Sequence, residues 1–184
     1  MQHVEQGSHC DPQPPPSEAP FFVVSPAKLG FMTFLTFGLY WWYCFYHNWR
    51  LHKLKTGEQI SPFLRVTFGL FFIYPLLSRV DECIRGSGKT YPWSILGLTI
   101  LYYSMMVPSI LAAIYMEDHI RAVIVLELVL GLAWVYILIR MQRAINFSAG
   151  DPAGDANNRV SLVNRLWMLP GLFAEVSKLY MFFG

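Results

Sequence analysis

Long hydrophobic runs with at most one charge alternate along this chain with short segments that carry most of its charges. Four runs predict helices, at residues 29–46, 66–78, 93–116 and 122–139. A helix needs about 20 apolar residues to cross the roughly 30 Å hydrocarbon core of a bilayer. The second run is short and contains Pro75. The pattern therefore predicts an all-α polytopic membrane bundle, with four transmembrane helices or with three plus a re-entrant or interfacial second helix.

Two Ser-Pro pairs indicate where the first two helices begin. Ser25-Pro26 and Ser61-Pro62 each offer a capping hydroxyl followed by a proline at the first helical position, where the missing N–H is not needed. A second repeated element, Thr-Phe-Gly-Leu, follows each pair, at residues 36–39 and again at 67–70. The recurrence hints at an internal duplication of the first two helices, although its distance from the Ser-Pro pair differs between the copies.

Composition shifts divide the chain into four parts. Residues 1–20 are rich in proline and predict a disordered tail, 21–147 hold the membrane helices, and 148–158 predict an exposed loop. The last part, 159–184, divides at Pro170-Gly171. Its second half places Phe173 and Val176 opposite Glu175 and Lys178 at helical spacing, which predicts an interfacial amphipathic helix.

Composition narrows the class of protein. Of 184 residues, 54% are hydrophobic and 14% are charged, and fourteen Lys and Arg nearly balance twelve Asp and Glu. A soluble α/β domain carries about 25% charged residues, and a nucleic-acid binder needs a clustered basic face. We therefore expect the lipid bilayer as a partner and no nucleic acid. Residues 86–90 end in Gly-Lys-Thr but lack the first glycine and the preceding strand of a phosphate loop, so no nucleotide is expected.

The orientation in the membrane depends on the second helix, because Lys and Arg in short loops favour the cytoplasm. With four spans, nine of these residues share the side of both chain ends and five lie on the other side. With a re-entrant second helix, the division becomes twelve against two and the chain ends lie on opposite faces. The second arrangement follows the rule better but uses a rarer architecture.

The stretch Thr36-Phe37-Gly38-Leu39-Tyr40-Trp41, followed by Asn48-Trp49 and by Ile60-Ser61-Pro62, resembles a signature of small bacterial inner-membrane proteins of unknown function. The resemblance covers roughly residues 25 to 80, and it departs at Trp42 and Cys44, where an aliphatic residue and a tryptophan are expected. It implies a multi-pass protein of the bacterial inner membrane and no catalysis. The signature positions predicted to pack helices are Thr36, Phe37, Gly38, Tyr40, Trp41, Asn48, Trp49 and Pro62.

Glu127 is the strongest single candidate for a functional residue. An ionisable side chain inside a span is costly and normally faces protein or water. Glu127 interrupts the run at 122–139, so it predicts an ion or proton site. The alternative is a glutamate that is protonated or hydrogen-bonded between helices, with Tyr102, Tyr103 or Ser104 as its partner.

A basic patch closes the first run. Arg50, His52, Lys53 and Lys55 can bind anionic lipid head groups or fix the orientation of the chain. The spacing of the three cysteines gives no zinc site, and no Ser/His/Asp or Cys/His arrangement has a recognisable frame, so no metal, cofactor or enzymatic activity is expected.

Three functions stay open. The first is a non-enzymatic integral membrane protein that acts by packing its helices against itself or a membrane partner. The second is a small transporter or channel subunit that uses Glu127. The third is an immunity protein or an accessory subunit of a membrane complex.

Overall fold

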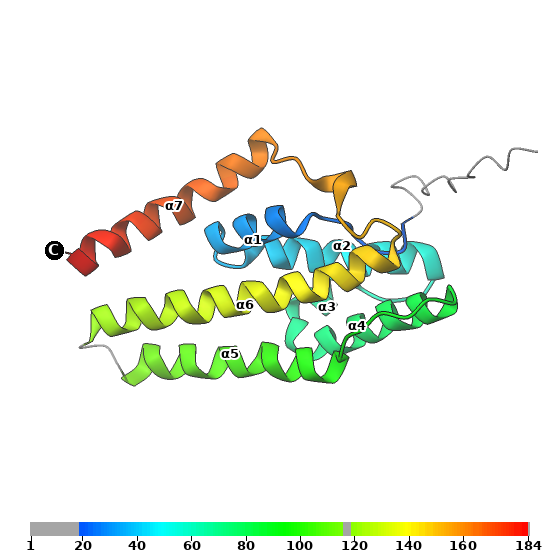
Figure 1. Cartoon of the computed structure of the whole chain (residues 1–184), viewed down its shortest axis with the longest axis horizontal. Coiled ribbons are helices and arrows are strands. Elements are labelled where there is room, and N and C mark those ends of the chain that lie inside the picture. The colour runs from blue at the N-terminus through cyan, green and yellow to red at the C-terminus, as the bar shows by residue number, and fades with distance from the viewer. Residues whose placement is uncertain (1–18, 116–118, 184) are drawn as a thin grey trace, which may run out of the picture.

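The computed structural model describes residues 19–115 and 119–183, and its regular elements in these ranges are all helices (Figure 1). The all-α class is therefore confirmed for the described residues. Of the predicted tail, only Ala19 and Pro20 fall within them.

The first hydrophobic run folds back on itself. Helix α1 (Pro26–Leu35) begins as predicted, because the Ser25 hydroxyl accepts a hydrogen bond from the Lys28 amide (3.3 Å). It ends before Phe37 and Gly38, whose φ angles are +50° and +85°. Helix α2 (Leu39–Thr56) then runs back beside α1 (Figure 1). The prediction of one continuous helix over 29–46 is wrong, since the left-handed backbone at this turn reverses the chain.

Backbone and side-chain bonds fix the turn. The Gly38 amide donates to the Thr33 carbonyl (2.8 Å), which is the closure that ends many helices at a glycine. The Thr36 hydroxyl donates to the Met32 carbonyl (2.6 Å) and accepts from the Tyr40 amide (3.0 Å). Thr36 thus ends α1 and caps α2 with one side chain.

The second copy of Thr-Phe-Gly-Leu also marks a break. Ser61 caps helix α3 (Pro62–Thr67), as predicted, and α3 gives way at Phe68 to helix α4 (Gly69–Gly86). Gly69 lies directly against the ring of Trp42, which would have to move to make room for a larger residue. Both copies of the repeat therefore separate a short Ser-Pro-capped helix from an 18-residue helix.

Two described helices are long and apolar enough to cross a membrane. They are α5 (Ile95–Tyr115) and α6 (Ile120–Ser148), which lie side by side and antiparallel (Figure 1). Only 17% of the spanning window in α5 and 11% of that in α6 is buried within the chain, so their apolar faces are open to the surroundings. The predicted count of four spans is not confirmed.

The last helix, α7 (Leu162–Phe183), packs against α1 and α6. The predicted division at Pro170-Gly171 is wrong, because the helix continues through both residues. Gly171 is buried and its backbone lies against the Leu35 carbonyl at the end of α1, a contact that any side chain would block.

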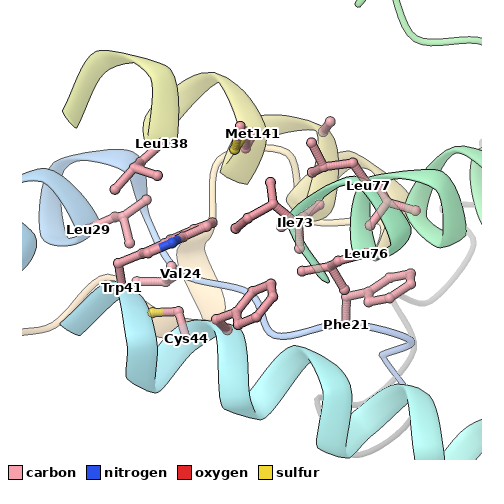
Figure 2. Packing of buried hydrophobic residues seen from close by; sticks show 14 of the residues in the cluster. Phe21, Val24, Leu29, Trp41, Cys44, Ile73, Leu76, Leu77, Leu138 and Met141 are labelled. Atoms are coloured by element: carbon pink, nitrogen blue, oxygen red, sulfur yellow. The ribbon is translucent and has the colours of Figure 1, made fainter. Parts of the chain in front are cut away.

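The core lies where α2, α4 and α6 meet the extended segment before α1. Figure 2 shows Trp41 and Cys44 of α2 facing Ile73 and Leu76 of α4, with Leu138 and Met141 supplied by α6. Phe21 and Val24, from the extended segment, are buried in the same cluster. Burial of apolar side chains is the main stabilising term in folding, and it fixes this end of the molecule.

Side-chain amides hold the extended segment in place. Asn146 donates to the Val24 carbonyl (2.9 Å) and accepts from the Val24 amide (3.3 Å). Gln142 donates to the Phe22 carbonyl (2.9 Å) and to the Asn146 side chain (2.8 Å), while Asn48 accepts from the Phe22 amide (2.9 Å). The segment is thereby paired as a strand would be, with side chains in place of a neighbouring strand.

The loop after α6 is exposed at most positions but anchored at two. The Asp151 carboxylate accepts from the amides of Gly154, Asp155 and Ala156 and shapes the short 3₁₀ helix η1 (Asp155–Asn157). Gly154 (φ +75°) lies so close to the backbone of Ser25 that a Cβ atom would come within 2.6 Å. The predicted loop therefore also covers the start of α1.

Candidate functional site

Glu127 has a charged partner fifty-one residues away along the chain. Its Oε2 lies 3.2 Å from the Lys178 Nζ of α7, and the same ammonium lies 3.3 Å from Oε1 of Glu175. Tyr102, Tyr103 and Ser104, the partners considered from the sequence, do not take this role, and the Ser104 hydroxyl donates to the Leu101 carbonyl. Lys178 was missed because nothing in the sequence indicates that α7 returns beside α6.

The second half of α7 turns Glu175 and Lys178 toward the bundle, whereas Arg165 near the start of the helix is exposed. The side chains of Glu175 and Lys178 are 25% and 28% exposed, whereas Phe173 and Tyr180 on the outer side are 77% and 79% exposed. A helix lying on a water-exposed surface shows the opposite arrangement. The amphipathic pattern predicted from the sequence is present, but its polar side faces α6.

A cavity of about 490 Å³ lies next to this ion cluster. Four elements line it: the end of α1 with the turn that follows, α5, α6 and α7. Most of its wall is apolar or aromatic, from residues such as Met105, Met106, Leu130 and Trp134, and the charged groups are Glu127, Glu175 and Lys178. Ligand sites commonly combine an apolar wall with a few polar groups in this way, at volumes of about 300–1,000 Å³.

The turn between α1 and α2 forms one side of the cavity. Phe37, which lines it, is the one described non-glycine residue with positive φ, a conformation that is costly and clusters at functional sites. The Lys178 ammonium lies 5.9 Å from the centre of its ring. Gly38 lies against Trp134, whose ring would be 2.9 Å from an added Cβ atom. The turn and the ion cluster are therefore parts of one site.

Thr33 is an unsatisfied polar group in the cavity wall. It is 1% exposed, and its hydroxyl has no hydrogen-bond partner among the described residues. A buried hydroxyl without a partner costs about 1–3 kcal/mol. Sequence reasoning did not identify Thr33, because a threonine in an apolar run gives no signal of its surroundings.

Four of the five remaining signature residues are buried in the core. Tyr40, Trp41, Asn48 and Trp49 are all buried, and Asn48 holds the extended segment. Pro62 stands at the first position of α3. The signature thus divides among the turn beside the cavity (Thr36, Phe37 and Gly38), the packing of α2 and the start of α3.

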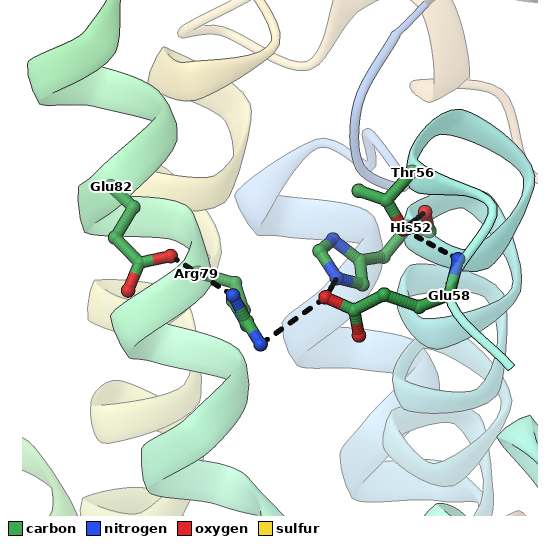
Figure 3. Close-up of polar contacts among 5 residues, drawn as sticks. All are labelled: His52, Thr56, Glu58, Arg79 and Glu82. Carbon is green, nitrogen blue, oxygen red and sulfur yellow. Dashed lines mark hydrogen bonds and ion pairs between the residues drawn. The ribbon is translucent and has the colours of Figure 1, made fainter. Parts of the chain in front are cut away.

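The four residues of the predicted basic patch differ in their exposure. Arg50 and Lys55 are exposed and Lys53 is half-buried, but His52 is 7% exposed and faces inward. Figure 3 shows Glu58 between His52 and Arg79, with its Oε1 3.5 Å from His52 Nε2 and 3.2 Å from Arg79 Nη2. Burial lowers the pKa of His52, and the Glu58 carboxylate opposes that effect. Glu58 therefore links His52 of α2 to Arg79 of α4.

Comparison of the chain with known protein families, curated proteins and solved structures gives no match. The resemblance of residues 25 to 80 to bacterial inner-membrane proteins therefore stays a prediction.

Proposed function

We propose that this chain is a non-enzymatic integral membrane protein, located in the bacterial inner membrane, that acts by packing its helices against a second copy or another membrane protein. One observation carries the proposal: α5, α6 and α7 present apolar side chains outward, while Glu175 and Lys178 in the second half of α7 turn inward beside Glu127. Such an inverted arrangement suits a surface that contacts lipid or apolar protein and does not suit water.

In this proposal α5 and α6 cross the membrane and α7 lies embedded beside them. α7 has 22 residues, about 33 Å of helix at 1.5 Å per residue. The α1–α2 hairpin, and not the predicted second helix, is the re-entrant element, since α1 with its 10 residues is about 15 Å long and turns back. Of the Lys and Arg residues, only Arg121 belongs to the tip that joins α5 to α6, which favours a cytoplasmic location for the opposite end.

Photo-crosslinking in native membranes tests the packing. A photoreactive amino acid at Leu132, which is 55% exposed on α6, should give a discrete product of twice the chain mass or a discrete adduct with one membrane protein. Leu54, which is 70% exposed beyond the spans, is the matched control and should give neither. A strictly monomeric mass in native mass spectrometry, with no discrete adduct from Leu132 or from Phe173, would overturn the proposal.

A second candidate is a small transporter or channel subunit that uses Glu127, favoured by the cavity beside that carboxylate. The Lys178 contact already neutralises part of its charge, so a transported ion would have to compete with an internal ammonium. Flux into proteoliposomes containing the wild-type protein or Glu127→Gln tests this candidate. Equal flux in the two preparations, at the level of empty liposomes, would exclude it.

A further inference from the structure

We propose that the cavity between the α1–α2 turn, α5, α6 and α7 is a binding site for a hydrophobic organic cation. The inference goes beyond helix packing and does not depend on whether the chain associates with a partner. Charge, wall chemistry and an unsatisfied hydroxyl each support it.

The charge in the cavity wall does not balance. Two carboxylates, Glu127 and Glu175, contact a single ammonium, and Lys178 is the only Lys, Arg or His among the described residues that line the cavity. One oxygen of each carboxylate contacts Lys178, so the other oxygen of each can accept from a further donor. The Glu127 side chain is 45% exposed and that of Glu175 is 25% exposed, so both carboxylates are accessible to a ligand. In the proposed membrane setting an excess negative charge is costly unless a cation or a proton neutralises it. The site therefore favours a positively charged occupant.

The wall suits a bulky apolar body. Met105, Met106 and Leu130 provide apolar surface, and methionine side chains adapt to ligands of different shape. Phe37 and Trp134 provide aromatic faces, which attract organic cations. The Lys178 ammonium already lies 5.9 Å from the ring centre of Phe37, so the cavity holds a cation next to an aromatic ring without any ligand. A small hydrated ion would gain nothing from these surfaces, whereas an organic cation uses both.

Thr33 provides an independent indication of an occupant. Its hydroxyl is buried in the same wall and unpaired among the described residues, whereas the hydroxyls of Thr36 and Ser109 beside it are bonded to backbone carbonyls. Buried polar groups are rarely left without a partner. Four buried side-chain atoms of the described residues have none, and Thr33 Oγ1 is the one of the four that lies in the cavity wall. The polar group of a ligand can supply that partner.

Two probes of the same shape and opposite charge test the inference. Tetraphenylphosphonium and tetraphenylborate are titrated against the full chain in nanodiscs of zwitterionic lipid, with empty nanodiscs as the background. We expect saturable binding of one tetraphenylphosphonium per chain and no saturable binding of tetraphenylborate. Equal binding of both probes, or no saturable binding of the cation, would overturn the inference.

Two variants connect the binding to the cavity. Glu175→Gln removes the excess charge but keeps the Glu127–Lys178 pair, and it should weaken tetraphenylphosphonium binding by about tenfold or more. Gly131→Leu fills the cavity without altering its charge, since the only atom near an added Cβ is a Phe34 ring carbon at 4.0 Å, and it should abolish binding. Glu82→Gln, on the exposed side of α4, is the control that should bind like the wild type.

The variants also separate this inference from the packing proposal. Unchanged affinity in Gly131→Leu would place the bound cation elsewhere and overturn the assignment, whatever the crosslinking from Leu132 shows. If Glu175→Gln fails to fold, as judged by its thermal unfolding, the result for Gly131→Leu alone decides. Loss of crosslinking with retained cation binding would instead refute the packing proposal and leave the cavity assignment standing.

Discussion

Asn146→Ala should release the extended segment that precedes α1. Asn146 is fully buried and bonds both backbone groups of Val24, which is itself fully buried. Alanine leaves the Val24 amide and carbonyl without these partners, and each unpaired buried group costs about 1–3 kcal/mol. At about 1.5 kcal/mol for each of the two groups, the segment loses about 3 kcal/mol of local stability. Its opening equilibrium should therefore rise by on the order of 100-fold.

The Cys44 thiol reports this opening. Cys44 is 0% exposed in the cluster that contains Phe21 and Val24, and burial raises the pKa of its thiol, so the closed form reacts slowly. With Cys10 and Cys83 replaced by serine, the rate of maleimide labelling in mild detergent measures how often the segment opens. When opening is fast relative to labelling, that rate follows the opening equilibrium.

A surface amide provides the comparison. Asn158 is exposed, and Asn158→Ala should label at the wild-type rate. Alanine is a better helix former than asparagine, so faster labelling in Asn146→Ala cannot come from a weaker α6. If Asn146→Ala is labelled at a rate within about threefold of wild type, the side-chain amide does not hold the segment. If Asn158→Ala is labelled as fast as Asn146→Ala, the acceleration comes from the assay and not from the segment.

Three further predictions follow from individual contacts. Gly38→Ala should lower the free energy of unfolding, measured by denaturant titration, by about 1–3 kcal/mol, because φ is +85° and Trp134 lies against the added Cβ. Gly86→Ala, which has open space around the added Cβ, is the control and should leave that free energy unchanged. Lys178→Met should lower the midpoint of thermal unfolding, because it leaves two carboxylates together without their ammonium. Lys178→Met combined with Glu127→Gln should recover part of that loss. A double variant that is less stable than the single one would refute the pairing of these charges. Burial lowers the folded-state pKa of His52, so the unfolded chain takes up the proton first and the free energy of unfolding should fall as the pH drops below about 6.5. His47, whose pKa burial also lowers, contributes to the same pH dependence. His52→Gln should therefore make the dependence less steep, and an unchanged dependence would exclude His52 as its source.

Local signals in the sequence predicted helix starts well. Ser25-Pro26 and Ser61-Pro62 begin helices because capping depends only on neighbouring residues. The reversal at Phe37 and Gly38 was missed because hydrophobicity alone cannot distinguish one 18-residue span from two shorter helices that fold together. The Thr-Phe-Gly element was the available signal, since a glycine after a helix often closes it.

The partners of the candidate site could not be predicted, because they depend on how distant helices return. Glu127 could be identified from the sequence, because a charge in an apolar run is costly. Its partner Lys178 and the cavity residue Thr33 come from opposite ends of the chain, so their meeting could not be predicted. Likewise, Gln142 and Asn146 resemble an ordinary polar helix end, and only the fold shows that they pair the backbone of residues 22 to 24.

Glu127 of α6 and Lys178 of α7 each account for the presence of the other in a largely apolar helix. Glu127 alone in α6 would expose a carboxylate to lipid, and Lys178 alone in α7 would expose an ammonium, so each helix by itself is a poor membrane segment. Packed together, they hold the two charges 3.2 Å apart, with the Lys178 side chain 28% and the Glu127 side chain 45% exposed. The contact therefore favours α7 beside α6 over α7 in water. Because Glu175 adds a second carboxylate to the same ammonium, the pairing that stabilises α7 also leaves the cavity with the negative charge that an organic cation would neutralise.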